Sequence, residues 1–140
     1  MADFPAPQSA PAVVAPPVSA GLLAYVLFAA AAILEILSRG LASPAPLLTI
    51  IGIAGVIVCY VKRGEARTTW VASHFTWLIH TFWWSLLWTV VGGLILVTLG
   101  LVLIGIPIAF GIWLVAAIWV LYRVVRGYLL FKDSKPIPGV

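Results

Sequence analysis

Hydrophobic and polar positions are segregated along this chain into four long apolar runs with short polar breaks between them. Residues 68–122, 55 in all, contain no Asp, Glu, Lys or Arg. A transmembrane helix needs ~20 consecutive apolar residues, so this stretch alone is long enough to cross a bilayer twice. The pattern therefore predicts an integral membrane protein.

The runs predict four spans, at residues 20–37, 47–61, 69–99 and 107–131. Proline, glycine and serine mark the breaks, at Ser43-Pro44-Ala45-Pro46 and Gly105-Ile106-Pro107. Because the runs are continuous rather than alternating, helices are favoured over a β-barrel. The predicted fold is an all-α integral membrane four-helix bundle. Its second span has ~15 apolar residues, or ~22 Å of helix, which is short for a ~30 Å hydrocarbon core.

Composition agrees with this class: 64% of the residues are hydrophobic and 9% are charged, against roughly 25% charged in soluble domains. Residues 1–19 hold five prolines, which predicts a disordered cytoplasmic tail before a transmembrane domain at 20–131. Residues 132–140 form a short C-terminal cytoplasmic tail. Cys59 stands alone in an apolar run, as expected of a buried thiol.

The distribution of basic residues predicts the topology. Seven of the eight lie between spans two and three or at the end of span four, and only Arg39 lies on the other side. The positive-inside rule then places both termini in the cytoplasm. Basic residues beside apolar runs are typical of contact with anionic membrane lipids, and they do not indicate nucleic-acid binding.

One face of the third span carries an aromatic stripe. At 100° per residue, its members fall within about 40° of one line: Trp70, His74, Trp77, Thr81, Trp84 and Trp88. The stripe is interpreted either as an interfacial aromatic belt or as a surface for a partner, lipid or substrate. Trp84 and Trp88 lie deeper, and we expect them to be packing or recognition residues. Loss of Trp88 should then destabilise the bundle more than loss of Trp70.

His74 and His80 are six residues apart, some 120° around a helix, and no third histidine exists. One chain cannot build a three- or four-ligand site from them, so neither haem nor metal is expected, and no cofactor is predicted. Hydrogen bonding and proton titration at the interface remain as roles for these rings.

Three charged residues in or near the spans are further candidates. Glu35 is the sole acidic residue within a span, and it either pairs with Arg39 at i+4 or handles protons or cations. Arg126 lies within snorkelling reach of the end of span four, whereas Arg123 lies deeper. Arg123 is therefore expected to have an interior partner, with Glu65 as the candidate.

Several segments together resemble a known family: Tyr60 to Trp70, Ser73-His74-Phe75, His80-Thr81-Phe82-Trp83, Tyr122 to Gly127 and Lys135-Pro136-Ile137-Pro138. They are similar to a bacterial family of small four-helix membrane proteins of unknown function. That family is distantly similar to the small channel-like subunit of the chloroplast inner-envelope import translocon. The resemblance implies a four-span bundle with cytoplasmic termini, and it supplies no catalytic residue.

The functional hypothesis is a non-enzymatic, multi-pass protein of the bacterial inner (cytoplasmic) membrane. It acts as an accessory or scaffold subunit that binds lipids, other membrane subunits or itself. The alternative is a small transporter or protein-conducting, translocon-like subunit. No nucleophile is paired with a base and no P-loop or metalloprotease motif occurs, so an enzyme is disfavoured.

Overall fold

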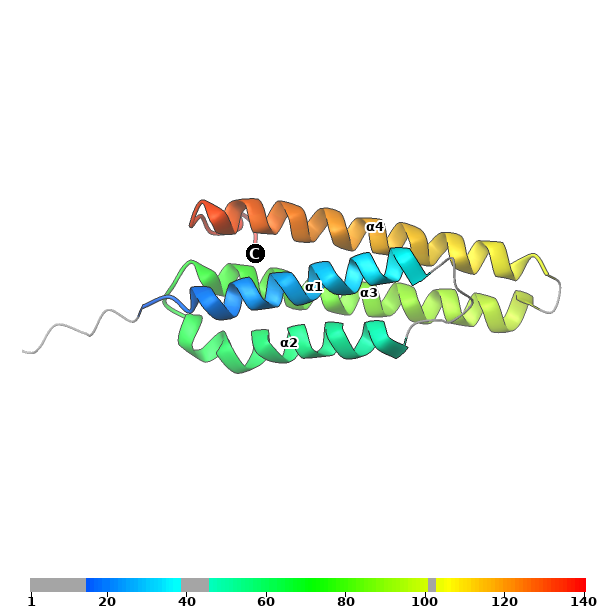
Figure 1. The fold of residues 1–140 in the computed structure, drawn as a ribbon, viewed down its shortest axis with the longest axis horizontal. Coiled ribbons are helices and arrows are strands. Elements are labelled where there is room, and N and C mark those ends of the chain that lie inside the picture. The colour runs from blue at the N-terminus through cyan, green and yellow to red at the C-terminus, as the bar shows by residue number, and fades with distance from the viewer. Residues whose placement is uncertain (1–14, 39–45, 101–102) are drawn as a thin grey trace, which may run out of the picture.

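The computed structural model describes residues 15–38, 46–100 and 103–140, and within them the chain is helical without strands (Figure 1). The four helices are α1 (Val18–Ser38), α2 (Pro46–Ala66), α3 (Val71–Leu99) and α4 (Gly105–Lys132). The predicted all-α, four-helix architecture is confirmed. The prediction of a disordered tail falls mostly on residues 1–14, outside the described part.

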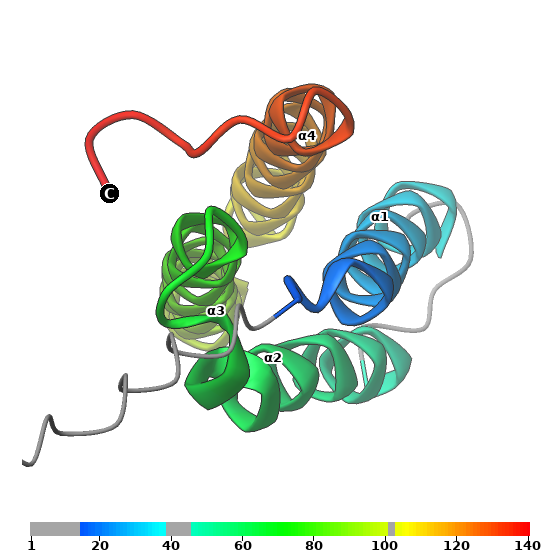
Figure 2. The same ribbon diagram turned by 90° about the vertical axis from the view of Figure 1, so that its left-hand side faces the viewer.

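The helices run alternately up and down, and each packs against its two neighbours in a ring (Figure 2). Within the described residues, α1, α3 and α4 are long and apolar enough to cross a membrane. Helix α2 continues past its apolar run through Lys62 and Glu65, so the whole helix of 21 residues is ~32 Å long. The ~22 Å given above is the length of the apolar run within it.

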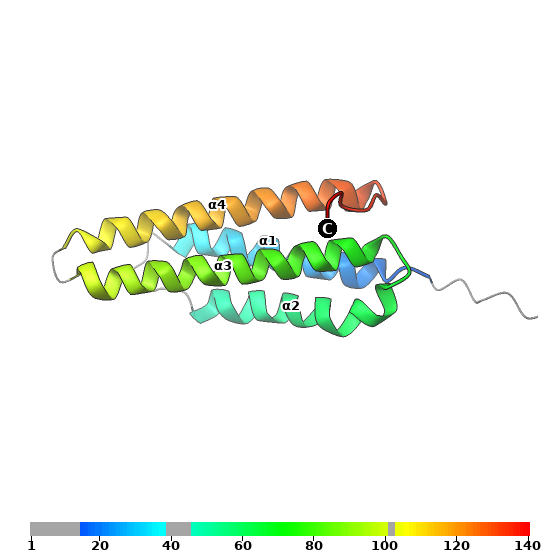
Figure 3. The same cartoon turned by 180° about the vertical axis from the view of Figure 1, so that it is seen from behind.

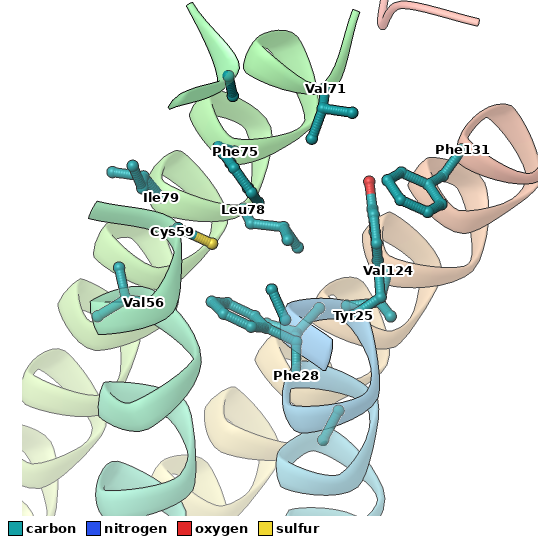
Figure 4. Close-up of a cluster of buried hydrophobic side chains, with 14 residues drawn as sticks. Tyr25, Phe28, Val56, Cys59, Val71, Phe75, Leu78, Ile79, Val124 and Phe131 are labelled. Carbon is teal, nitrogen blue, oxygen red and sulfur yellow. The ribbon is translucent and has the colours of Figure 1, made fainter. Parts of the chain in front are cut away.

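The main core lies toward the end of the bundle where α1 and α3 begin (Figure 4). Each helix contributes buried side chains, and Cys59 is one of them, as expected of a thiol in an apolar run. The set is dominated by Tyr25 and Phe28 of α1, Val56 and Cys59 of α2, Phe75 and Leu78 of α3, and Val124 and Phe131 of α4.

The two hairpins differ in length. Helix α3 has 29 residues and α1 has 21, a difference of ~12 Å at the helical rise. Figures 1 and 3 show the tip of the α3–α4 hairpin extending beyond the ends of α1 and α2. This projection is apolar and exposed, with Leu94 and Val97 on α3 and Ile106 on α4.

The chain reverses direction after α4. Ser134 adopts a left-handed conformation (φ 53°), and the Lys135 amide donates to the Leu130 carbonyl at 3.0 Å. This six-to-one bond closes the helix end. Residues 133–140, the C-terminal tail, leave α4 on the side away from α1 (Figure 2). Ile137 in this tail is buried, so the tail is part of the packed structure.

Helix α4 begins at Gly105 rather than near Pro107. Pro107 still lies in the first helical turn, where its missing N–H leaves no intrahelical bond unmade. The earlier start depends on glycine, because a Cβ at position 105 would lie 2.6 Å from the backbone nitrogen of Gly100.

We expect Gly105→Ala to destabilise the α3–α4 hairpin by ~1–3 kcal/mol, the usual range for overpacking, because it is backbone that must shift. Gly111→Ala on the same helix is the matched control, since its Cβ would meet nothing within 4 Å. That control should gain about 1 kcal/mol from helix propensity. Thermal unfolding in detergent, followed by circular dichroism, compares the two, and equal melting temperatures would contradict the close approach.

Candidate functional site

Basic side chains gather at one end of the bundle. Lys62 and Arg63 end α2, Arg67 lies in the turn before α3, and the remaining four lie in the last third of α4 or just after it: Arg123, Arg126, Lys132 and Lys135. The carboxylates described at this end are those of Glu65 and Asp133, which contact Lys62 and Lys135. The seven basic residues therefore lie at the same end of the bundle, as predicted. We call this end the basic end.

His74 is fully buried at the basic end and joins three segments. Its Nε2 lies 2.8 Å from the Lys135 carbonyl oxygen, and its Nδ1 lies 2.8 Å from the Tyr25 hydroxyl. A carbonyl only accepts, so Nε2 carries the proton and Nδ1 accepts from the Tyr25 O–H. The neutral imidazole thus ties α3 to α1 and to the C-terminal tail.

Aromatic rings enclose this imidazole. Trp70 and Phe131 meet it edge-on, with ring centroids 5.5 and 5.2 Å away. The Ser73 hydroxyl accepts from the Ile137 amide at 3.0 Å, a second bond between α3 and the tail. The tail is therefore fixed by two hydrogen bonds and one buried isoleucine.

Arg123 has interior partners, as expected, but they differ from the candidate. Its Nε donates to the Thr81 hydroxyl at 2.8 Å, and its guanidinium stacks 3.5 Å from the centre of a Trp77 ring. A second ring, that of Trp119, lies 5.0 Å away. Glu65 as its partner is wrong, because that exposed carboxylate accepts from Lys62 at 2.7 Å. A stacked guanidinium replaces lost hydration by the ring quadrupole, which a distant carboxylate could not do.

Arg126, one turn further along α4, is exposed. Residues at i and i+3 are neighbours on a helix surface, so two guanidinium groups lie on adjacent positions. Within the described residues, neither arginine forms an ion pair with a carboxylate.

The aromatic stripe is covered at four of its six members. The tail, Phe131 and Arg123 cover its first four members, whereas Trp84 and Trp88 are 52% and 42% exposed. The sequence predicts that these two are packing or recognition residues. Their exposure leaves them accessible on the outside of the bundle, so a role in recognition stays a prediction. We now expect loss of Trp70, which packs on the core, to be the more destabilising change.

Glu35 lines a cavity of about 70 Å³ between the helices, together with Ser85 and Thr89 of α3. Both hydroxyls donate to carbonyls of their own helix, at 2.8 and 2.9 Å. Arg39 lies outside the described residues, so the expected pairing with Glu35 remains a prediction. The carboxyl group nevertheless borders the bundle interior rather than only its surface.

His80 is exposed, and it points away from the buried His74 as the 120° offset predicted. Among the described residues, no three His, Cys, Asp or Glu side chains come together as metal ligands. Both nitrogens of His74 are already occupied by hydrogen bonds. The hydrogen bonds of His74 therefore hold separate segments of the chain together. The pair Arg123 and Arg126 still has donors with which to bind an anion.

Sequence reasoning missed two components of this site, Tyr25 and the docked tail. Tyr25 is the first polar group inside the first apolar run, which marks it as a side chain in need of a partner. The Lys135-Pro136-Ile137-Pro138 segment contributed to the family resemblance without any structural role being assigned to it. Proline on either side of Ile137 favours an extended backbone. The amide and carbonyl groups of such a segment make no hydrogen bonds with one another and can bond to α3.

Comparisons of the chain with protein-family models, with curated proteins and with solved structures found no match.

We expect Tyr25→Phe to lower the free energy of unfolding by ~1–3 kcal/mol, because it leaves Nδ1 of a buried imidazole without its donor. Tyr128→Phe is the matched control: Tyr128 contacts the Tyr25 ring at 6.2 Å, and its exposed hydroxyl makes no hydrogen bond in the described structure. Thermal unfolding in detergent measures the difference. Hydrogen exchange at the Ile137 amide should also accelerate in Tyr25→Phe, and unchanged exchange would show that the tail docks independently of His74.

Proposed function

We propose that this chain is a non-enzymatic subunit of the bacterial inner membrane, with four spans and both termini in the cytoplasm. It acts as an accessory or scaffold component of a larger membrane assembly. Helix lengths, apolar composition and the collected basic end support membrane insertion in this orientation.

One observation carries the functional part of the proposal: the buried polar groups form hydrogen bonds with other groups of this chain. Within the described residues, every buried side-chain nitrogen and oxygen atom has a hydrogen-bond partner. The hydroxyls of Thr76, Thr81, Ser85 and Thr89 donate to carbonyls of α3 itself. A catalytic site needs an activated group directed at a substrate, whereas a scaffold needs a rigid bundle with an available outer surface.

The second candidate is a small transporter or protein-conducting subunit, favoured by the cavity beside Glu35. Acidic residues within membrane-spanning helices are rare, and they often mark ion or proton paths. At about 70 Å³ the cavity holds a few waters rather than a polypeptide. Within this alternative, proton or cation handling is therefore better supported than protein conduction.

The topology is tested by reporter fusions. Fusions at residues 1–10, 64 and 140 should report the cytoplasm, whereas fusions near residues 44 and 104 should report the opposite side, because the basic residues are divided seven to one. The fusion at Gly64 is the most informative, because its result depends on whether α2 crosses the membrane completely. An external signal there would exclude the four-span arrangement.

The assembly role is tested by site-specific photo-crosslinking in cells. A photoreactive residue at Val97, 74% exposed on the projecting hairpin, is compared with one at Val61, 68% exposed on α2. We expect a discrete, stoichiometric protein adduct from one of the two positions, identified by mass spectrometry. Adducts with lipid alone at both positions would contradict the scaffold role. Glu35→Gln is then assayed for proton or cation flux in proteoliposomes, where a loss would favour the transporter.

A further inference from the structure

Trp88, the last member of the aromatic stripe, borders a groove. This groove, of about 510 Å³, runs along the outside of the α3–α4 seam and is lined on α3 by Trp88 and on α4 by Ile112, Val115 and Trp119. Its size lies within the roughly 300–1,000 Å³ of ordinary small-molecule sites. Its lining is almost wholly apolar, so it suits a hydrocarbon chain.

The groove leads to the arginine pair at one end. Trp119 lines the groove, and the same indole ring lies 5.0 Å from the Arg123 guanidinium. Positions 108, 112, 115, 119 and 126 fall on one face of α4 at helical spacing, with Arg123 beside them. An elongated ligand in the groove would therefore have its end within reach of both guanidinium groups.

Arg123 is oriented for an anion. Its Nε is used by Thr81, and its ring contacts fix the guanidinium plane, while its two Nη groups make no hydrogen bond within the described residues. The planar donors of arginine match the oxygens of a phosphate. With Arg126 adjacent and no carboxylate paired to either, this end of the groove carries positive charge without a described counter-ion.

We propose that the α3–α4 seam is a binding site for an anionic phospholipid, with one acyl chain in the groove and the phosphate at Arg123 and Arg126. The proposal rests on the membrane insertion inferred above, but it requires no partner protein. Charge complementarity selects the lipid over an apolar transmembrane helix, because such a helix would leave both arginines without an anion. The indoles of Trp88 and Trp119 supply the walls that hold the chain.

Native mass spectrometry of the full-length protein in mild detergent tests this site. The protein is mixed with equal amounts of phosphatidylglycerol and phosphatidylcholine that have identical acyl chains. We expect one phosphatidylglycerol retained per chain, with about tenfold preference. Both lipids carry the phosphate, but phosphatidylcholine also places a choline cation beside the two guanidinium groups, and such a like-charge contact is unfavourable. Arg123→Gln should reduce the preference to near parity, while Arg63→Gln, which removes the same charge from exposed α2, should retain it.

Two glycine variants test the groove itself. Gly111 lines the groove, and a Cβ there meets nothing within 4 Å, so Gly111→Leu fills the groove without disturbing the bundle. It should lower retention of both lipids about tenfold, by displacing the acyl chain. Gly93→Leu is the matched control, because its Cβ also has open space and it lies on α3 outside the groove lining.

Each contrary result overturns the proposal. Equal retention of both lipids by the unmodified chain would mean that the site does not select an anionic head group. Equal effects of Arg123→Gln and Arg63→Gln would mean a general attraction of charge. Unchanged retention in Gly111→Leu would exclude the groove, and a dimer abolished by Gly111→Leu would assign the groove to a second copy. If Arg123→Gln fails to fold because Thr81 loses its partner, the comparison of Gly111→Leu with Gly93→Leu decides whether lipid binds in the groove. The topology fusions and crosslinks report on the proposed function separately.

Discussion

The arrangement at the basic end depends on one constraint: a buried imidazole has no water with which to hydrogen bond. His74 meets this constraint by accepting from Tyr25 on α1 and donating to the carbonyl of Lys135 in the tail. Three segments distant in sequence are thereby fixed by a single side chain. Since an unmet bond in an apolar environment costs more than in water, the same ring that joins these segments also excludes alternative packings.

Arg123 is under the same constraint, because a partly buried charge must also find its partners within the protein. It lies nine residues before the end of α4, ~14 Å from it, and its side chain is partly buried. Thr81 and two indole rings surround the guanidinium, and its remaining donors face the seam. The stripe on α3 thus has two functions along its length: cohesion where tail and arginine cover it, and an open apolar wall where they do not.

The fold was largely predictable from the sequence, because a charge-free run of this length has few physical solutions. Helix positions, the buried Cys59, the separate faces of His74 and His80, and an interior partner for Arg123 all followed from periodicity and charge. The exposure of Trp84 and Trp88 could not be predicted, because periodicity places residues on a face but does not say what lies opposite that face. Docking of the tail likewise depends on tertiary contacts, through the Ile137 amide and the Lys135 carbonyl, which local sequence does not encode.

The unequal hairpins have a consequence for the surrounding lipid. A bilayer whose hydrocarbon thickness matches α1 leaves ~12 Å of the α3–α4 tip in water, whereas one that matches α3 draws the ends of α1 and α2 below its surface. Hydrophobic mismatch costs fractions of a kcal/mol per ångström and is relieved by tilt or by local thinning. In a membrane this chain would therefore deform the two sides of its lipid annulus differently, thinner beside α1 and α2 and thicker beside α3 and α4. The stability of the inserted protein would then depend on membrane thickness, independently of any ligand.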